Sequence, residues 1–400
     1  MWAAIAIFTG TYLVLALGGV PLLRVDRAGA AIIGATLMVA SGVLTLEEAV
    51  QAIDHQTIFL LFGMMIVVAN LRLSGFFRLV AAWAVQHAPR PFWLLAAVVW
   101  TTGVLSAFFV NDTMCLVMTP LVLEVAAALG RNPLPYLLGV ALASNIGSAA
   151  TITGNPQNMM IGAFSGIAYR TFAAALAPVA ALGLLLTMAV LTAAHWQEFR
   201  AEPPLPRASL RVRVNRVLLA KSLAVAGGMI AGFFAGWPVP VAALLAGALL
   251  LVTRRVKPEK IYREVDWPLL AMFTGLFIVV AGMEKAVLAD EAVRIASRLR
   301  LDRPAVLTGA AAVLSNLVSN VPAVLVFKPL IGHLPDPQRA WLVLAMASTF
   351  AGNLTLVGSV ANLIVVERAR RHARITFLAY LRAGLPLALL SLALGAWMLR

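Results

Sequence analysis

The two halves of the chain repeat one another in three blocks without gaps. The segment DHQTIFLLFGMMIVVA (54–69) aligns with DWPLLAMFTGLFIVVA (266–281) at an offset of 212 residues. The other two pairs are 105–121 with 314–330, at an offset of 209, and 143–158 with 347–362, at an offset of 204. Three blocks in the same order are hard to obtain by chance. The sequence therefore predicts two structurally related halves.

Both halves are too apolar for a soluble domain. The chain is 62% hydrophobic and 12% charged, whereas soluble domains carry about 25% charged residues. We expect an all-α polytopic membrane protein, whose spans need about 20 apolar residues each. The expected spans are 2–23, 28–46, 55–76, 136–163, 172–195, 216–236, 239–253, 267–287, 339–366 and 376–399. Cys115 is the only cysteine, which excludes disulfides and cysteine-based metal clusters within the chain.

Two further apolar stretches, about 92–130 and 304–333, have polar residues at their centres. These are VNDT at 110–113 and SNVP at 319–322, and amphipathic segments (77–89 and 288–300) precede the two stretches. We interpret each stretch as a re-entrant hairpin with a polar tip. Two full crossings would give the other spans the same orientation, so charge does not decide between these readings.

Basic loops set the expected orientation and the domain boundaries. The net charge of +14 is attributed to cytoplasmic loops, not to nucleic-acid binding, because such loops are enriched in Lys and Arg. The Arg-rich loop 196–216 is expected in the cytoplasm, in a multi-pass protein of the inner or plasma membrane. We divide the chain into 1–196, a basic linker 197–215, and 216–400. Five spans and one hairpin per half make the second half inverted, as in secondary transporters.

Polar breaks interrupt one predicted span in each half, around 147–156 and 352–359. Irregular backbone survives in hydrocarbon only where it lines a cavity, so we expect each break to meet a hairpin tip there. Helix N-termini suit anions, and unwound carbonyls with Ser, Thr and Asn oxygens suit Na⁺. The first break is the more polar, with Asn145, Asn155 and Gln157 where the second has Thr349, Ser359 and Ala361. Ion coupling is therefore expected in the first half.

Several candidate residues keep a structural alternative. Ser106 and Asn111 repeat as Ser315 and Asn320 and could turn oxygens toward one ion, or cap the local backbone. Asp112 is interpreted as a proton or cation coupling group, or as a cap on the following helix. Gly147 and Gly352 alone are consistent with helix packing. The remaining charges near apolar runs, Glu124, Glu284, Lys221 and Lys328, are expected to snorkel or pair, and Lys328 is also a weak candidate for attracting anions.

At these residues the chain resembles the ion-transporter superfamily of arsenite permeases, D-type sodium–proton antiporters, citrate carriers and divalent anion–sodium symporters. The marks are VNDTMCLVMTP, SNVPAVLVFKP and NIGSAATITGNPQN, and the last variant is most similar to little-characterised anion permeases. Val110, Asp112 and Val321 replace the Ser and Thr residues of the symporter tips, and Asn-Asp at the first tip resembles the arsenite-permease branch. The resemblance implies a homodimer and an elevator-like movement.

Repeat and resemblance together give two sets of candidate site residues. Coupling-ion candidates are Ser106, Asn111, Asp112, Asn145, Gly147, Ser315, Ser319 and Asn320, of which the resemblance contributes Ser319. Substrate candidates are Asn111, Thr113, Thr151, Gly154, Asn155, Pro156, Asn158, Asn320, Asn353, Thr355, Gly358 and Asn362.

The predicted function is secondary active transport of a small anion or oxyanion, coupled to Na⁺ or H⁺. No other cofactor is expected, and membrane lipid is the expected surrounding. Arsenite or antimonite efflux is one alternative, and sodium–proton antiport through Asp112 is another. A passive channel is disfavoured by the inverted repeat. An enzyme is disfavoured because neither H-E-x-x-H nor G-x-S-x-G occurs.

Overall fold

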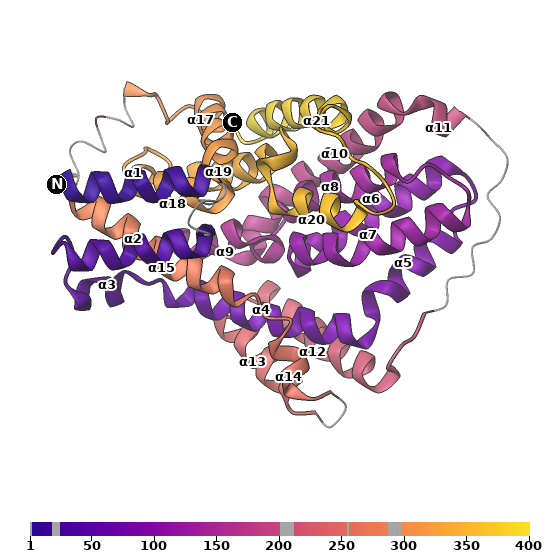
Figure 1. Cartoon of the computed structure of the whole chain (residues 1–400), viewed down its shortest axis with the longest axis horizontal. Coiled ribbons are helices and arrows are strands. Elements are labelled where there is room, and N and C mark those ends of the chain that lie inside the picture. The colour runs from indigo at the N-terminus through magenta and orange to yellow at the C-terminus, as the bar shows by residue number, and fades with distance from the viewer. Residues whose placement is uncertain (1, 18–24, 201–211, 254–255, 287–293, 295–297) are drawn as a thin grey trace.

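The computed structural model describes residues 2–17, 25–200, 212–253, 256–286, 294 and 298–400 (Figure 1). Some expectations fall outside these residues. They are the end of the first span (18–23), most of the central loop (201–211), two arginines of the basic segment after residue 253 (254–255), and most of the amphipathic stretch 288–300.

The described part of the chain is built from helices, and its element order repeats. The first half contains α1 (Trp2–Leu17), α2 (Arg27–Ala40), α3 (Leu46–Ala52), α4 (His55–Ser74), α5 (Phe76–Gln86), α6 (Pro91–Phe109), α7 (Asn111–Ala128), α8 (Leu134–Ser148), η2 (Ile152–Gly154), α9 (Pro156–Ser165), α10 (Tyr169–Ala194) and α11 (Trp196–Arg200). The second contains α12 (Arg216–Phe234), α13 (Val239–Leu251), α14 (Pro258–Tyr262), α15 (Trp267–Ala286), α17 (Pro304–Val318), α18 (Asn320–Ile331), α19 (Pro337–Ala351), η3 (Leu356–Gly358), α20 (Val360–Ala369) and α21 (Phe377–Met398).

Both predicted hairpins turn on a single residue. Val110 separates α6 from α7 with a φ of 59°, and Ser319 separates α17 from α18 with a φ of 78°. Positive φ is uncommon for residues other than glycine, so each tip is a strained turn that ends one helix and begins the next. The arms are 19 and 18 residues long in the first hairpin and 15 and 12 in the second. At 1.5 Å per residue, only the first hairpin has arms of full span length.

Both predicted broken helices are interrupted where the sequence placed the breaks. In the first half the helix stops at Ser148 and resumes at Pro156 after one 3-10 turn. In the second it stops at Ala351 and resumes at Val360, again after one 3-10 turn. Each hairpin packs against the broken helix of its own half, and α7 also packs against α20. The polar segments of the two halves are thereby gathered at one place.

Outside this centre, helices of one half pack on helices of the other half. The α4 helix packs on α13, and α15 packs on α2. A Cβ added to Gly63 would lie 2.5 Å from the carbonyl carbon of Ala243, and one added to Gly275 would lie 2.6 Å from that of Ala31. Both glycines and both alanines correspond at the offset of 212. Two halves related by a two-fold axis make reciprocal contacts of this kind. The inverted orientation of the second half stays a prediction.

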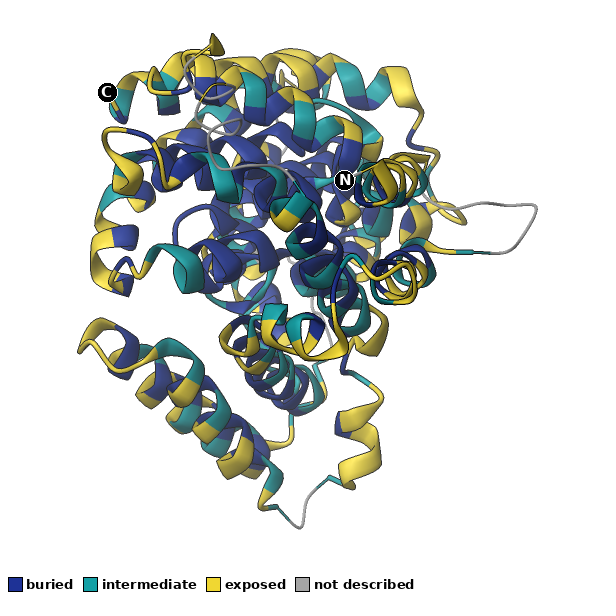
Figure 2. Ribbon diagram, turned by 90° about the vertical axis from the view of Figure 1, so that its left-hand side faces the viewer, coloured by how far each residue is buried: buried dark blue, intermediate teal, exposed yellow. Residues whose placement is uncertain are grey.

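The surface of the molecule fits a lipid environment. Seven described helices are long and apolar enough to cross a membrane, and buried residues concentrate at the centre while the outer helix faces are exposed (Figure 2). Exposed tryptophans lie close to helix ends, where the bilayer interface favours them. They are Trp2, Trp93, Trp196, Trp237, Trp267 and Trp397, and Trp83 lies on the amphipathic α5.

Candidate functional site

Both halves line one cavity, which we call the main cavity. Its volume is about 480 Å³, within the usual range of small-molecule sites. Besides α2, which begins at Arg27, four helices of the hairpins and breaks begin at residues that line it: α7 at Asn111, α18 at Asn320, α9 at Pro156 and α20 at Val360. A helix N-terminus carries unpaired N–H groups and a partial positive charge. The cavity therefore offers a favourable environment for the oxygen atoms of a small solute.

Charged side chains of both signs also line the main cavity. Asp112 lies in the first turn of α7, Asp26 and Arg27 lie at the start of α2, and Asp266 precedes α15. The carboxylate of Asp26 accepts from the N–H of Gly29 at 2.8 Å, and that of Asp266 accepts from a backbone N–H of α15 at 3.0 Å. These two exposed acids cap helices, whereas Asp112 is half-buried beside the first hairpin tip. No side chain caps the N-terminus of α7.

Asn145 connects the first hairpin to the second break. Its side-chain oxygen accepts from Asn111 Nδ2 at 3.1 Å and from Ser359 Oγ at 3.0 Å. Its Nδ2 donates to Asn353 Oδ1 at 2.9 Å and to Asn362 Oδ1 at 3.1 Å. All five side chains are buried. The predicted coupling residues of the first half and substrate residues of the second thus form one hydrogen-bonded network.

Thr349, the repeat mate of Asn145, makes the reciprocal contact. Its hydroxyl lies 3.3 Å from Asn155 Nδ2 and 3.2 Å from Gln157 Nε2. Asn155 and Ser359 correspond at the offset of 204, so each half places this position of its broken helix against the partner break. The network is more extensive around Asn145 because an amide has more donors and acceptors than a hydroxyl.

The side chains of Asn158 and Asn362 stabilise the two breaks through hydrogen bonds to backbone carbonyls. Asn158 Nδ2 donates to the carbonyls of Ser148 at 3.2 Å and Thr151 at 3.0 Å. Asn362 Nδ2 donates to the corresponding carbonyls, at 2.7 Å for Gly352 and 3.3 Å for Thr355. Buried carbonyls without a partner are costly, so these two amides compensate for the lost helical bonds. Their contacts are those of structural braces.

The two Ser–Asn pairs at the hairpins differ. Ser315 Oγ lies 2.7 Å from Asn320 Oδ1 and 3.0 Å from the carbonyl of Ser348. In the first hairpin, Ser106 Oγ and Asn111 Oδ1 are buried and have no hydrogen-bond partner within the described part of the chain. Buried polar atoms without partners are rare. The first pair therefore leaves two oxygens available to a ligand, and the second pair is satisfied internally.

The remaining predicted residues divide by location. Asn111, Asp112, Pro156, Ser319 and Asn320 line the main cavity. The predicted residues outside its lining are Ser106, Thr113, Asn145, Gly147, Thr151, Gly154, Asn155, Asn158, Ser315, Asn353, Thr355, Gly358 and Asn362.

Close packing explains some of the residues outside the lining. Thr151 donates to the carbonyl of Ala107. A Cβ on Gly147 would lie 2.2 Å from the carbonyl oxygen of Gly103, and one on Gly154 would lie 2.0 Å from that of Ser148. Both glycines therefore allow close backbone packing, which is the structural alternative kept for Gly147.

Sequence reasoning missed several residues of the site. Arg27, Asp266 and Ser359 line the main cavity, as does Gln157, which the sequence predicted to line a cavity but not to bind the ion or the solute. Asn316 donates to the carbonyl of Ala351 and accepts from Thr355 at 2.7 Å. Gln157 and Ser359 lie in the polar breaks and could have been included on that ground. Nothing in the sequence separates Arg27 from the other basic residues near span ends.

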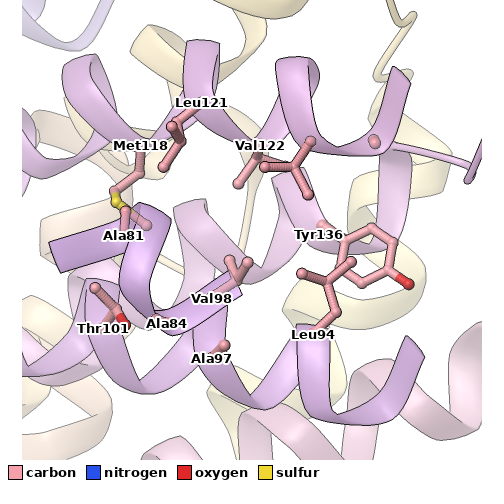
Figure 3. A pocket seen from close by; sticks show the side chains of 12 residues that line it. Ala81, Ala84, Leu94, Ala97, Val98, Thr101, Met118, Leu121, Val122 and Tyr136 are labelled. Carbon is pink, nitrogen blue, oxygen red and sulfur yellow. The ribbon is translucent and has the colours of Figure 1, made fainter. Parts of the chain in front are cut away.

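Another pocket lies between α5, α6, α7 and α8 and is apolar (Figure 3). Leu94, Val98, Met118 and Val122 point into it, and Tyr136 closes one end. Its volume is about 10 Å³, which accommodates about one water molecule. It is a packing gap within the first hairpin region and is too small for a solute.

Comparisons with known proteins agree with a transport site. The model of the family described as citrate transporter (CitMHS) matches residues 7–351. The silicon efflux transporter LSI3 of Oryza sativa subsp. japonica is 31% identical over 94% of this chain and 93% of its own. A Dictyostelium discoideum transporter named arsB is 25% identical over 93% of this chain and 87% of its own.

Among solved structures, the YdaH transporter of Alcanivorax borkumensis superposes with a TM-score of 0.64 at 16% identity. That match covers 100% of this chain and 96% of YdaH, and it supports the fold. The family match spans most of the sequence and includes both hairpins and the first break. The chain is therefore a membrane transporter that belongs to the CitMHS citrate transporter family.

Proposed function

We propose that the protein is a secondary active transporter of a small oxyanion or of the uncharged hydroxide from which it forms, coupled to H⁺ or Na⁺. The convergence of four helix N-termini on the main cavity carries the proposal. Such termini stabilise electronegative oxygens without needing a basic residue at each one. The solute is proposed to cross by an elevator-like movement.

The charges of the main cavity limit the range of solutes that it can bind. Three carboxylates and one guanidinium line it, so an ionised tricarboxylate such as citrate would meet more repulsion than attraction. A compact solute with hydroxyl groups avoids this repulsion and can still contact the amides and hydroxyls of both tips. LSI3 is named as a silicon efflux transporter, and silicic acid is an uncharged hydroxide of the class proposed here. Cys115 alone excludes capture of arsenic by three thiolates, so contacts through oxygen and amide groups remain.

The coupling ion is proposed to bind in the first half. In the first hairpin, the buried oxygens Ser106 Oγ and Asn111 Oδ1 are without a hydrogen-bond partner in the described part of the chain, and Asp112 is adjacent in sequence to Asn111. Hydroxyl, amide and carboxylate oxygens are suitable ligands for Na⁺, and a carboxylate beside them can carry a proton instead. The second hairpin has already used its equivalent oxygens in a mutual hydrogen bond. We therefore propose a single coupling-ion site, in the first half.

Flux measurements in proteoliposomes test the proposal. Silicic acid, arsenite, antimonite and citrate are offered separately, with and without a Na⁺ gradient and a pH gradient. We expect flux of at least one metalloid hydroxide that exceeds citrate flux and depends on one of the gradients. Citrate as the sole transported solute would contradict the proposed substrate. Na⁺-driven H⁺ movement without any solute would instead identify an antiporter.

A further inference from the structure

Among the described residues that line the main cavity, Arg27 is the only basic one. It is half-buried and is the first residue of α2, directly after the N-cap Asp26. The repeat does not require a cation there, because the equivalent residue at the offset of 212 is Val239, the first residue of α13. The guanidinium is therefore a feature of this cavity and not of the fold that both halves share.

The three carboxylates of the main cavity do not pair with Arg27. Within the described part of the chain, none of them forms an ion pair with its guanidinium. Asp26 accepts a backbone N–H of α2 at 2.8 Å, and Asp266 accepts one of α15 at 3.0 Å. Both serve as helix caps, and Asp112 is the group proposed for coupling. The acids of the cavity therefore have other roles, and the guanidinium is left for a ligand.

The position of Arg27 is unfavourable for a cation unless an anion is bound. The N-terminus of a helix carries a partial positive charge and disfavours a cation by about 0.3–1 kcal/mol. Partial burial adds the cost of removing the guanidinium from water, which an anion or another acceptor offsets. An anion bound at the start of α2 removes both costs. The placement of this arginine is thus explained by binding and not by folding.

The shape of the guanidinium limits the anion that it can bind. Its planar fork binds two oxygens of one group at once, whereas an ammonium acts as a point charge. The starts of α2 and of α15, which packs on it (Figure 1), form part of the lining, and the hairpin tips and breaks form most of the rest. A solute held by two oxygens on Arg27 can direct its other atoms toward Asn111 and Asn320. The three carboxylates oppose a higher charge, so a single negative charge fits best.

We propose that Arg27 is a specificity-determining residue that binds the solute as a singly charged oxyanion, through two of its oxygens. The uncharged hydroxide of the same element binds more weakly at this place. The inference rests on the proposed function for the identity of the solute. It does not depend on the coupling ion, because the residues proposed to bind that ion belong to the first hairpin.

The test compares two small trigonal probes that differ in charge, bicarbonate and boric acid. Near neutral pH bicarbonate is an anion with two unprotonated oxygens, whereas boric acid is uncharged. The purified protein is titrated with choline bicarbonate, with choline chloride at equal ionic strength, or with boric acid. The melting temperature reports the affinity, because a ligand stabilises the state that binds it. Bicarbonate should bind at least ten-fold more tightly than boric acid.

Substitutions of Arg27 assign the difference between the probes to this side chain. Arg27→Gln should weaken bicarbonate binding at least ten-fold and leave boric acid binding unchanged. Arg27→Lys keeps the charge without the fork and should recover only part of the affinity. Equal bicarbonate affinity in Arg27→Gln and the unmodified protein, or no bicarbonate binding by the unmodified protein, would overturn the inference. If Arg27→Gln does not fold, full bicarbonate affinity in Arg27→Lys contradicts binding through the fork.

The matched control is Arg216→Gln. Arg216 is also the first residue of a helix, α12, and follows an N-cap, Asn215, but it is exposed and lies outside the lining of the main cavity. This variant should bind bicarbonate as the unmodified protein does. An equal loss of affinity in Arg216→Gln and Arg27→Gln would show that the effect comes from net charge and would contradict a site at Arg27.

Arsenite flux in proteoliposomes separates this inference from the proposed function. Bicarbonate should inhibit that flux in the unmodified protein and at least ten-fold less strongly in Arg27→Gln. Bicarbonate binding that depends on Arg27, without flux of any metalloid hydroxide, removes the proposed substrate and leaves the role of Arg27 standing. Metalloid flux that bicarbonate inhibits equally in both proteins does the reverse.

Discussion

Equivalent residues of the two halves differ in their hydrogen bonds. The Ser–Asn spacing is the same in both hairpins, and the sequence alone placed both pairs among the candidate ligands of the coupling ion. In the structure Ser315 and Asn320 bond to each other, whereas the oxygens of Ser106 and Asn111 stay without partners. This difference depends on side-chain orientation at strained tips, which spacing does not determine. The sequence did identify the first half as the more polar one, through Asn145 and Asn155.

Replacing the first hairpin serine should separate cation binding from folding. Ser106→Ala removes an oxygen without a partner, so we expect little loss of stability and loss of any Na⁺-dependent rise in the melting temperature Tm. Ser315→Ala is the matched control. It removes a bonded hydroxyl and should cost about 1 kcal/mol while the Na⁺ response remains. Melting curves in detergent with NaCl or choline chloride measure both effects. An intact Na⁺ response in Ser106→Ala would contradict the assignment of the site.

Asp112→Asn should uncouple transport from its driving gradient. The amide keeps the size of the side chain and removes the charge that a coupled proton or cation neutralises. We expect the gradient-driven flux to fall about ten-fold or more, equivalent to at least about 1.4 kcal/mol, while exchange without a gradient continues. Thr113→Ala, one residue further and outside the cavity lining, is the control. Unchanged gradient dependence in Asp112→Asn would leave this carboxylate without a coupling role.

At the scale of elements, each broken helix is stabilised by an asparagine side chain. The sequence had suggested these two asparagines as substrate ligands. Asn158 and Asn362 were predicted substrate residues from the repeat and the resemblance. The structure supplies partners for their amides from the break itself, through carbonyls seven and ten residues earlier. The positions of both breaks were predictable from Gly, Pro and the repeat. The roles within them were not, because a polar side chain can satisfy either the backbone or a ligand.

Asn158→Ala should therefore destabilise the fold and not only weaken solute binding. It removes the amide donor from the buried carbonyls of Ser148 and Thr151, which keep only longer bonds from Asn155 Nδ2 at 3.3 Å and from the Gly154 N–H at 3.4 Å. We therefore expect a cost of about 1 kcal/mol for each bond lost. We expect a lower Tm and reduced yield, and solute addition should not restore either. Thr113→Ala, at a half-buried position whose side chain pairs with no break carbonyl, should melt like the unmodified protein. A normal Tm combined with weakened solute binding would show that Asn158 binds the solute and does not stabilise the fold.

Close packing between the halves gives a second prediction at this scale. Gly63→Ala brings a methyl group to within 2.5 Å of the α13 backbone, and backbone atoms cannot give way as flexible side chains do. We expect a loss of about 1–3 kcal/mol, typical of overpacking, seen as a lower Tm. Gly228→Ala in α12 is the control, since nothing lies within 4 Å of its added Cβ. Equal melting of the two variants would show that α4 and α13 are not packed so closely.

At the scale of the whole molecule, the fold was largely predictable and the cavity was not. The repeat, the hydropathy and the two polar tips predicted the all-helical fold and the helical turns at Val110 and Ser319. That the two hairpins are re-entrant stays a prediction, since both arms of the first are long enough to cross a membrane. The main cavity, however, also takes Asp26, Arg27 and Asp266 from the starts of α2 and α15. These charges come together only because α15 of the second half packs on α2 of the first half. The homodimer implied by the resemblance stays a prediction, as does the placement of the central loop in the cytoplasm.

The membrane orientation makes the last prediction. The α3 and α11 helices lie at opposite ends of the molecule (Figure 1), which supports α3 facing away from the central loop. The segment 368–374 is rich in arginine and is expected on the cytoplasmic side. Gln51→Cys in α3 and His372→Cys are both exposed positions, and the buried Cys115 should not react. An impermeant maleimide added to intact cells should label Gln51→Cys, and should label His372→Cys only after the membrane is opened. The reverse pattern would invert the orientation, and labelling of both in intact cells would contradict a separation of α3 and this basic segment by the membrane.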